Sequence, residues 1–378
     1  MERRTLLQAG VAALGARGAP LALLAVKETA GLRRFGYPVV VPLRFGHGEV
    51  KDARQLELVG PAGNTIAAEW AVGERWPDSS LRRVSACFNL SIGPGEATLL
   101  SVRLRPEPAP EPPGQRAQES ADGWQLLAYH IPKAGPALVD RIRYALGEFV
   151  RPEGLRLHAV TAAGERLAAE TRSVRLLRAG PIHPAVELTG IYRTATGEIP
   201  WCATVECPNS KSWVAITHRL AGERGPIATV GLSLPYAFER APARVDFGCG
   251  SWVYAQLRAG EALRLRCEGG RWEMALGRPD RLAPYARTSR VQPRFEGWGH
   301  LIDGAPGGRA IAFGSTEWAS GRPGEIVITS DGRLTASWAA SDRRYTFVAH
   351  HVADPVQVTA LTSPVSMLWP LAVRAIRR

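Results

Sequence analysis

Short apolar runs separated by turn residues recur along almost the whole chain. In the first part these runs are 38–45, 55–59, 66–73, 82–89 and 98–104, with Gly, Pro, Asn and Asp between them. Short runs bounded by such residues predict β-strands joined by tight turns. We therefore expect a small barrel over residues 35–105.

The same pattern continues from residue 120 to residue 375, with almost no stripe of helical period. Residues 137–146 resemble a helix at first sight, but Leu138, Ile142, Tyr144 and Leu146 also fit a period of two, which favours a strand. Many short strands at regular spacing predict a large β-sandwich. The fold class is all-β, a small β-barrel followed by a large β-sandwich.

Residues 106–119 separate the two regions, because this stretch is rich in proline and charge and can form neither a helix nor a central strand. We interpret it as a linker. Within the barrel region, the corner Trp76-Pro77-Asp78 predicts a turn in which Asp78 bonds the backbone two residues further on.

The chain has 378 residues, 45% of them hydrophobic, and a formal net charge of +12. All but four of the cationic side chains are arginines, which bind carboxylates and phosphates well. An anionic partner and a compositional bias of a GC-rich genome both explain this. Nucleic acid is the weakest anionic candidate, because no Lys/Arg run, zinc finger or aromatic RNA-binding signature occurs.

Residues 1–25 begin with Arg3-Arg4 and continue with a short Ala/Leu-rich stretch, which is typical of a twin-arginine export signal. A frayed cytoplasmic N-terminus is the alternative. We predict a periplasmic or secreted protein. No later stretch reaches 18 consecutive apolar residues, so we expect no transmembrane span in the mature chain.

The five cysteines are too few and too irregularly spaced for a disulfide scaffold or a zinc site. We expect buried free thiols. His350 and His351 are adjacent, and neighbouring side chains of a strand point to opposite faces, so they cannot share a metal ion. We predict no metal and no cofactor.

The order of strands and turns resembles exo-rhamnogalacturonan lyase-like proteins. The pieces that carry this resemblance are YPVVVPLRFGHGEV at 37–50, the Arg-Trp-Pro-Asp corner, YHIPKAGPALVDRI at 129–142, DFGCGSWVYAQL at 246–257 and GWGHLIDGAPGGRAIAFGSTEW at 297–318. The resemblance implies an N-terminal RIFT-barrel domain and a central β-sandwich, together spanning roughly residues 35–375. It also implies a carbohydrate ligand.

Full-length members of that family continue into a C-terminal α/α toroid, and the amphipathic helices of a toroid are missing from this sequence. We therefore expect recognition of carbohydrate without catalysis. No nucleophile elbow, HExxH, Walker loop or dinucleotide fingerprint occurs in the chain. A glycosidase that works through paired carboxylates stays open, because such a pair has no spacing rule in sequence.

A Gly-rich segment that must turn tightly carries the candidate binding residues. Indole rings stack on sugars, and His, Asp and Arg bind hydroxyl or carboxylate groups. The alternative is that the tryptophans belong to the core and that the Asp-Gly pair forms a hairpin turn. The candidates for substrate binding are Trp298, His300, Asp303, Arg309 and Trp318.

The sequence favours an exported carbohydrate-binding or accessory protein, with acidic polysaccharide as one candidate ligand. A polysaccharide lyase or hydrolase with its site in the sandwich cleft is the second hypothesis. The third is a structural subunit that docks to a separate toroid protein through an apolar patch at residues 367–371, which could equally be a last strand tucked into the core.

Overall fold

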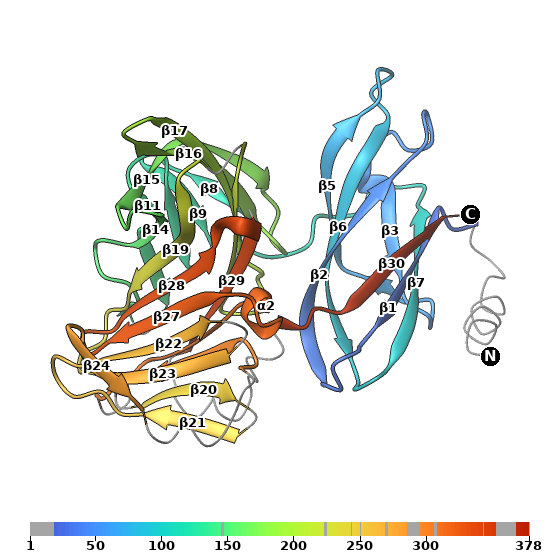
Figure 1. Cartoon of the computed structure of the whole chain (residues 1–378). Coiled ribbons are helices and arrows are strands. Elements are labelled where there is room, and N and C mark those ends of the chain that lie inside the picture. The colour runs from blue at the N-terminus through green and yellow to red at the C-terminus, as the bar shows by residue number, and fades with distance from the viewer. Residues whose placement is uncertain are drawn as a thin grey trace.

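The computed structural model describes residues 19–144, 147–222, 225–242, 244–249, 251–268, 271–285, 295–305, 308–342, 344–352 and 368–377. Almost all regular structure in this part is β-strand, which confirms the all-β class. The exceptions are the short helix α2 (Thr316–Ala319) and two 3-10 turns, η1 (Ala53–Gln55) and η2 (Ala340–Asp342). Two domains lie side by side (Figure 1).

The first domain consists of two sheets that enclose one apolar core. One sheet has the order β30-β1-β7-β3-β4 and the other the order β2-β6-β5. Alternate residues of the strands point inward, so Leu24, Phe88 and Val102 are fully buried. The strands are β1 (Ala22–Lys27), β2 (Arg34–Arg44), β3 (Leu56–Val59), β4 (Thr65–Ile66), β5 (Ala68–Arg75), β6 (Leu81–Ile92), β7 (Ala97–Leu104) and β30 (Ala372–Arg377).

Two strands of this domain come from outside the range 35–105. Strand β1 pairs in register with β7, although its first residues fall in the segment 1–25 that the sequence assigns to an export signal. Strand β30 pairs with the other edge of β1, so the end of the chain returns to the first domain instead of finishing the sandwich. Leu371, from the apolar stretch 367–371, is buried in the first domain's core.

The Trp76 corner forms as the sequence predicts. The Asp78 carboxylate accepts from the backbone N–H of Ser80 at 3.0 Å, and the Trp76 indole N–H donates to the Phe45 carbonyl at 3.1 Å. These contacts fix the turn between β5 and β6.

A small sheet follows the linker, with the order β13-β12-β10-β9-β8. The region expected as a strand at 137–146 contributes β11 and β12 within the described residues. The strands of this part are β8 (Gln118–Glu119), β9 (Gly123–Leu126), β10 (Tyr129–Pro132), β11 (Ala137–Val139), β12 (Arg141–Tyr144) and β13 (Gly147–Glu148).

The sandwich contains two large layers that face each other. One layer lies on the side of the first domain and is called the domain-facing sheet. Its strand order is β15-β16-β17-β18-β29-β26-β25-β20-β21. Its strands are β15 (Arg166–Arg178), β16 (Ala185–Thr194), β17 (Gly197–Glu206), β18 (Trp213–Leu220), β20 (Arg244–Cys249), β21 (Ser251–Ala255), β25 (Trp298–Ile302), β26 (Ala310–Gly314) and β29 (Arg344–Val352).

The outer sheet runs β14-β19-β28-β27-β22-β23-β24, with the beginning of β15 and the short β11 beside β14. Because β15 pairs with both β14 and β16, it joins the two layers. The strands are β14 (Leu155–Thr161), β19 (Ile227–Pro235), β22 (Ala262–Glu268), β23 (Arg271–Arg278), β24 (Arg281–Pro284), β27 (Gly324–Thr329) and β28 (Arg333–Ala339).

The first domain packs against the domain-facing sheet. Side chains on the outside of that sheet, Trp213, Ala310, Ala312 and Val348, belong to the apolar cluster of the first domain. Tyr37 meets Trp213 edge to face, with 5.9 Å between ring centroids. The shared apolar contact holds the two domains together and leaves the second large sheet on the far side of the sandwich.

Four cysteines, Cys87, Cys202, Cys207 and Cys267, are buried free thiols, as expected. Burial raises the pKa of the Cys87 thiol to about 12, which makes it unreactive at neutral pH. The fifth, Cys249, has no described side chain. Within the described residues, no helix combines the length and the apolar character needed to cross a bilayer.

Candidate functional site

Two of the sequence-predicted residues, Trp298 and His300, lie together on strand β25 of the domain-facing sheet. Their side chains are on the face of that sheet that points away from the sandwich core. Their rings are parallel, with centroids 6.2 Å apart, and both side chains are buried. The His300 Nε2 atom is 2.5 Å from the Asp246 carboxylate, which also accepts from Arg244 Nε at 2.8 Å. Sequence reasoning missed Asp246, because only the pairing of β20 with β25 places it opposite His300.

The other three predicted residues have separate contacts. The Asp303 carboxylate accepts backbone N–H groups of Glu239, Arg240 and Ala305 at 3.0–3.1 Å, which fixes two turns. Arg309 donates to the Ala237 carbonyl at 2.6 Å. Trp318 is fully buried and stacks on a second tryptophan, with 4.8 Å between centroids.

The five predicted residues therefore do not converge on one surface. Four of them are buried, and Arg309 is partly buried and bonded to the backbone. A sugar that arrives from solvent cannot stack on Trp318 or Trp298 while these rings are covered. Sugar binding at these residues stays a prediction, and their burial weighs against it.

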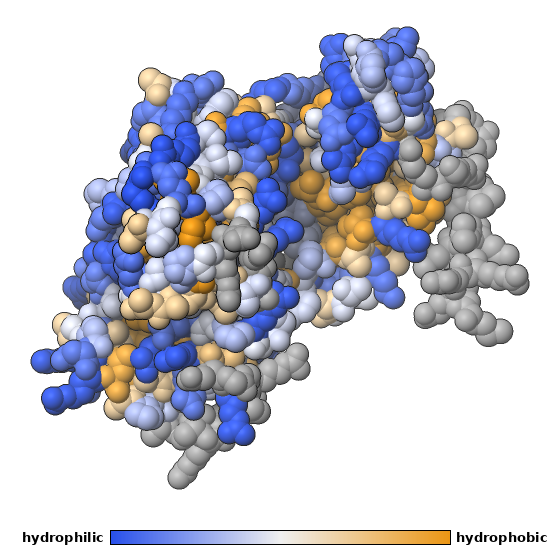
Figure 2. All heavy atoms as spheres, turned by 45° about the horizontal axis from the view of Figure 1, so that its top comes forward, coloured by the Kyte–Doolittle hydropathy of each residue, from blue (hydrophilic) through white to orange (hydrophobic). Residues whose placement is uncertain are grey.

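A groove between the two domains has the dimensions of a ligand site. It encloses about 540 Å³, within the range of small-molecule sites. Figure 2 shows the surface hollowed between the two lobes. The interdomain groove is lined by Ala53, Arg54, 68–72, 109–112, Arg116 and 176–180.

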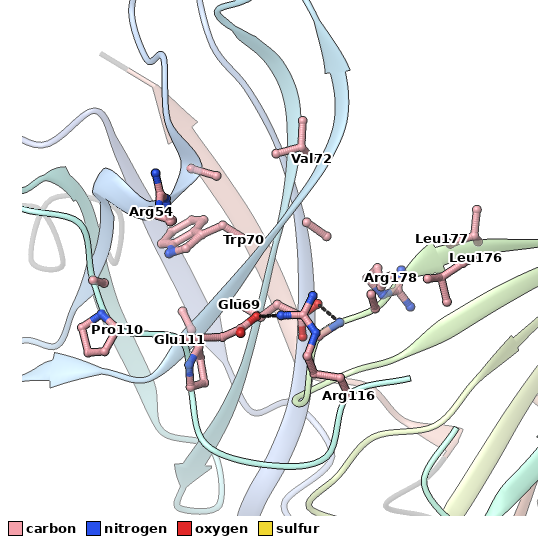
Figure 3. Close-up of a pocket in the computed structure, with 17 residues that line it drawn as sticks. Arg54, Glu69, Trp70, Val72, Pro110, Glu111, Arg116, Leu176, Leu177 and Arg178 are labelled. Carbon is pink, nitrogen blue, oxygen red and sulfur yellow. Dashed lines mark hydrogen bonds and ion pairs between the residues drawn. The ribbon is translucent and has the colours of Figure 1, made fainter. Parts of the chain in front are cut away.

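Strand β5, the linker and the end of β15 form the walls of this groove (Figure 3). Strand β5 is the last strand of its sheet, and within the described residues it is paired on one side only. An unpaired strand edge presents backbone N–H and C=O groups that hydrogen-bond to a ligand. The linker is held beside it by the Ala109 N–H, which donates to the Arg54 carbonyl at 2.8 Å.

Trp70 supplies the aromatic surface of the groove. Its indole is partly buried against the core of the first domain and also lines the groove, next to Arg54 in Figure 3. A rigid aromatic face beside polar groups is an arrangement that suits a sugar ring, which has both apolar C–H faces and hydroxyls. No sequence pattern indicates this role, because Trp70 is an ordinary residue of a predicted strand.

Three ion pairs involve arginines that line the groove. Arg116 pairs with Glu111 on the linker, and both side chains are about half exposed. Arg178 pairs with Glu206 and is nearly buried. Arg54 is exposed and held by Asp52 at 2.7 Å. Because each of these arginines has an acidic partner, the groove is close to charge-balanced. The guanidinium groups supply hydrogen-bond donors and the carboxylates supply acceptors, a combination that suits the hydroxyl groups of a ligand.

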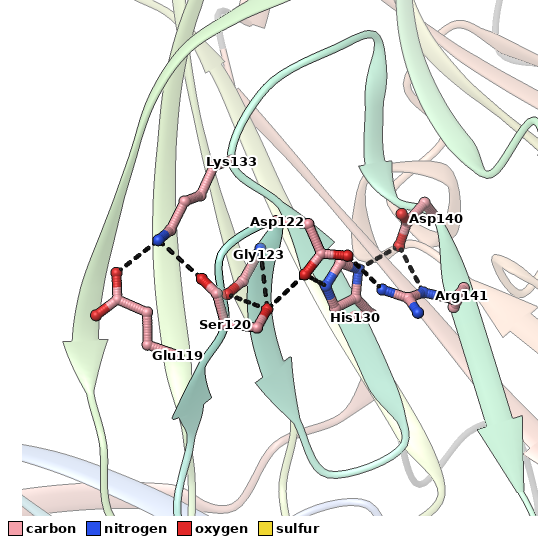
Figure 4. Close-up of polar contacts among 8 residues, drawn as sticks. All are labelled: Glu119, Ser120, Asp122, Gly123, His130, Lys133, Asp140 and Arg141. Carbon is pink, nitrogen blue, oxygen red and sulfur yellow. Dashed lines mark hydrogen bonds and ion pairs between the residues drawn. The ribbon is translucent and has the colours of Figure 1, made fainter.

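A second polar cluster lies on the small sheet (Figure 4). His130 Nδ1 is 2.6 Å from Asp140, and its Nε2 is 3.5 Å from Asp122, which Arg141 also contacts at 3.0 Å. Ser120 donates to Asp122 at 2.6 Å. The His130 nitrogens are buried, so no substrate reaches them, and the cluster stabilises the hairpin around Gly123.

Among the described residues, no three His, Cys, Asp or Glu side chains are arranged to hold a metal ion. The side chain of His350 lies outside the described residues, and His351 packs in an aromatic cluster with Tyr129 and Tyr144. The Tyr129 hydroxyl contacts His351 Nδ1 at 3.1 Å.

No family model matches the chain, and no curated protein matches it by sequence. Similar solved structures do exist. An α-mannosidase from Enterococcus faecalis V583 has a TM-score of 0.56 and 8% identity, over 94% of this chain and 46% of that protein. A glycosyl hydrolase family 38 protein from Enterococcus faecalis has a TM-score of 0.55 and 8% identity, over 94% and 47%.

The chain spans about half the length of these two proteins. At 8% identity the likeness shows the fold alone: the arrangement of a first β-domain and a large sandwich also occurs in these proteins. The resemblance to rhamnogalacturonan lyase-like proteins stays a prediction.

Proposed function

We propose that this protein is an exported carbohydrate-binding protein that holds a glycan in the interdomain groove, without catalysis of its own. The main observation behind this proposal is that Trp70 and the exposed Arg116–Glu111 ion pair line the same groove of about 540 Å³. Trp70 stacks on one face of a sugar ring. Arg116, Glu111 and the free edge of β5 then bind the hydroxyl groups around it.

Two further observations support a carbohydrate ligand in general, without pointing to the groove. The similar solved structures are described as an α-mannosidase and a glycosyl hydrolase family 38 protein, and the sequence resembles lyase-like proteins that act on rhamnogalacturonan. The ligand screen should therefore contain mannose-containing glycans, rhamnogalacturonan, polygalacturonate and neutral controls.

Isothermal titration calorimetry of the full chain against this panel tests the proposal. We expect Trp70→Ala and Arg116→Ala each to weaken binding of the positive glycan at least ten-fold. Phe35→Ala is the matched control, because Phe35 is an exposed aromatic side chain outside the groove. No binding to any glycan, or equal losses in all three variants, would reject the groove. Absorbance of unsaturated uronates, recorded in the same samples, would reveal lyase activity and reject a binding-only role.

The export part of the proposal rests on Arg3-Arg4 and the apolar stretch after them. Fusion of residues 1–30 to a reporter in a bacterial host with the twin-arginine pathway tests it. Reporter export that Arg3→Lys with Arg4→Lys abolishes is the expected result, and export of both forms, or of neither, would contradict it.

A further inference from the structure

Two arginines lie side by side on the domain-facing sheet, on the face that points away from the sandwich core. Successive residues of a strand point to opposite faces, and Ile216 and Leu220 of β18 belong to the core, so Arg219 points away from it. Tyr345 of β29 is a core residue, so Arg344 points the same way. The register of the two strands places Arg344 directly opposite Arg219. The Cβ atoms of directly opposite residues are about 5 Å apart, so the two guanidinium groups extend from neighbouring points of the surface.

This pair of arginines lacks a counter-charge. Both side chains are exposed, and within the described part of the chain neither has a carboxylate within ion-pair distance. The neighbour of Arg219 on its other side is Cys202 of β17. Burial raises the pKa of the Cys202 thiol, so that side chain carries no charge at neutral pH. Like charges directly opposite on paired strands repel each other, and an anion bound between them removes this repulsion.

Arginines elsewhere on the same sheet are matched with carboxylates. Arg175 Nη2 is 2.8 Å from Glu187 Oε1, and Arg193 Nη1 is 2.8 Å from Glu198 Oε1. A general surplus of arginine in the chain does not explain why these side chains have acidic partners and the opposite pair on β18 and β29 has none. The missing counter-charge is therefore a local property of that pair.

Two hydroxyl groups lie next to the arginine pair. Thr217 and Thr346 are also directly opposite each other, two residues along the same strands and on the same face. Their Oγ1 atoms are 3.2 Å apart, so one hydroxyl donates to the other and the second keeps a proton to donate. Residues two apart on a strand are separated by about 7 Å, which places both hydroxyls within reach of a group bound by the arginines.

The first domain encloses these four side chains on one side. Ala215 and Val348, the next opposite pair along the strands, pack against the apolar cluster of the first domain. The threonines beside them are partly exposed, and the arginines beyond are exposed. The surface formed by Arg219, Arg344, Thr217 and Thr346 is thus a ledge at the foot of the first domain, and we name it the arginine–threonine ledge.

We propose that the arginine–threonine ledge is a second binding site, which takes the carboxylate or sulfate group of an acidic saccharide. The two guanidinium groups donate charge-assisted hydrogen bonds to the oxygens of the anionic group. The threonine hydroxyls bond to the same group or to a sugar hydroxyl beside it. Described side chains around the ledge on this face, Cys202, Thr204 and Thr189, are not aromatic, which disfavours single-stranded nucleic acid, whose bases stack on aromatic rings. The site is separate from the proposed groove and does not depend on it.

Calorimetry on the full chain with Trp70→Ala measures this site apart from the groove. The probes are tetragalacturonate, its fully methyl-esterified form, a sulfated tetrasaccharide and an oligothymidylate of equal charge. We expect binding of at least one acidic saccharide and none of the methyl ester. Added Arg219→Gln or Arg344→Gln should weaken the binding at least ten-fold, and added Thr217→Val about five-fold. Arg193→Gln makes the same change of formal charge at an arginine that has a carboxylate partner, so it is the control and should change affinity less than two-fold.

Equal weakening by Arg193→Gln and Arg219→Gln would mean a diffuse charge effect and would overturn the proposal. Absence of binding of both acidic saccharides, or equal binding of the methyl ester, would overturn it as well. Oligothymidylate binding as tight as that of the saccharides would overturn the assignment to a saccharide and identify nucleic acid as the ligand.

Thermal unfolding gives an independent readout. Without ligand, Arg219→Gln should unfold at the native temperature or above it, because one of two like charges is removed. A lower unfolding temperature would show that Arg219 serves the sheet itself and would overturn the proposal. A saturating acidic saccharide should raise the unfolding temperature of Trp70→Ala, and this increase should disappear when Arg219→Gln is added.

Discussion

The carboxylate of Glu69 on strand β5 accepts a hydrogen bond from the backbone N–H of Gly180 at 3.2 Å, across the boundary between the two domains. It also accepts from the N–H groups of Ile182 and His183 at 3.2 and 3.4 Å. An added Cβ at position 180 would lie 2.1 Å from the carboxyl carbon, so the approach requires a glycine. Since Glu69 and Gly180 both line the groove, this contact fixes the separation of its walls.

Glu69→Gln should destabilise the protein by about 1–3 kcal/mol, because an amide satisfies fewer of the three N–H groups and carries no charge. Urea unfolding measures the change, and Glu165→Gln, an exposed side chain in a turn, is the control. The same variant should weaken glycan binding in the groove, since its walls lose their spacing. Full stability of Glu69→Gln would show that the contact does not hold the domains.

The lowered pKa of Glu28 in the folded protein makes the free energy of unfolding depend on pH. The side chain is fully buried, and burial alone would raise its pKa. Hydrogen bonds from the backbone N–H groups of Gly95 and Ala30 and from Arg34 prevail and lower the pKa to about 2. A carboxyl with a lowered folded-state pKa stabilises the fold above its ordinary value of 4.5, and this stabilisation is lost as pH falls from there toward 2.

Glu28→Gln should therefore be less stable than the native chain at pH 7, and the difference should shrink toward pH 2. Urea unfolding at several pH values between 7 and 2 measures it, with Glu107→Gln on the exposed part of the linker as the control. A difference that stays constant over this range would contradict the pKa assignment.

Local sequence patterns predicted much of the fold, whereas contacts between distant segments were not predictable. The Asp78 turn needs only a partner two residues away, so its prediction is confirmed. The alternation that predicts strands says nothing about which strand is the neighbour. For this reason the return of β30 to β1 was missed, and so was the contact between His300 and Asp246.

The same limit explains why the groove was not predicted. Trp70 and Arg116 are far apart in sequence, and only the packing of the linker beside β5 brings them to one groove. The same holds for Arg219 and Arg344, which are opposite each other because β18 and β29 pair in one particular register. A shift by one residue would place them on opposite faces, and composition carries no information about that register.

The Asp246–His300 contact predicts a large effect of a single substitution. Both side chains are fully buried. Removal of the Asp246 carboxylate takes away the contact partner of the His300 imidazole and of the Arg244 guanidinium. Asp246→Ala should destabilise the fold by about 1–3 kcal/mol, the range for leaving a buried hydrogen-bonding group without its partner. Thermal or urea unfolding measures this, and Asp280→Ala in an exposed turn should change stability little. Comparable stability of both variants would contradict the assigned pairing.

Substitution of Trp318 distinguishes a role in the hydrophobic core from a role in sugar binding. The ring is fully buried and stacks on Trp338, which in turn stacks on Tyr345 at 3.9 Å. Removal of such a side chain leaves a cavity, so Trp318→Ala should cost about 3–5 kcal/mol in the free energy of unfolding. Trp318→Phe should recover part of that loss, because most of the apolar volume returns. Glycan affinity, measured on the folded fraction of Trp318→Phe at low temperature, should equal that of the native chain. Normal stability combined with lost affinity would instead restore Trp318 as a sugar-binding residue and place the site in the sandwich.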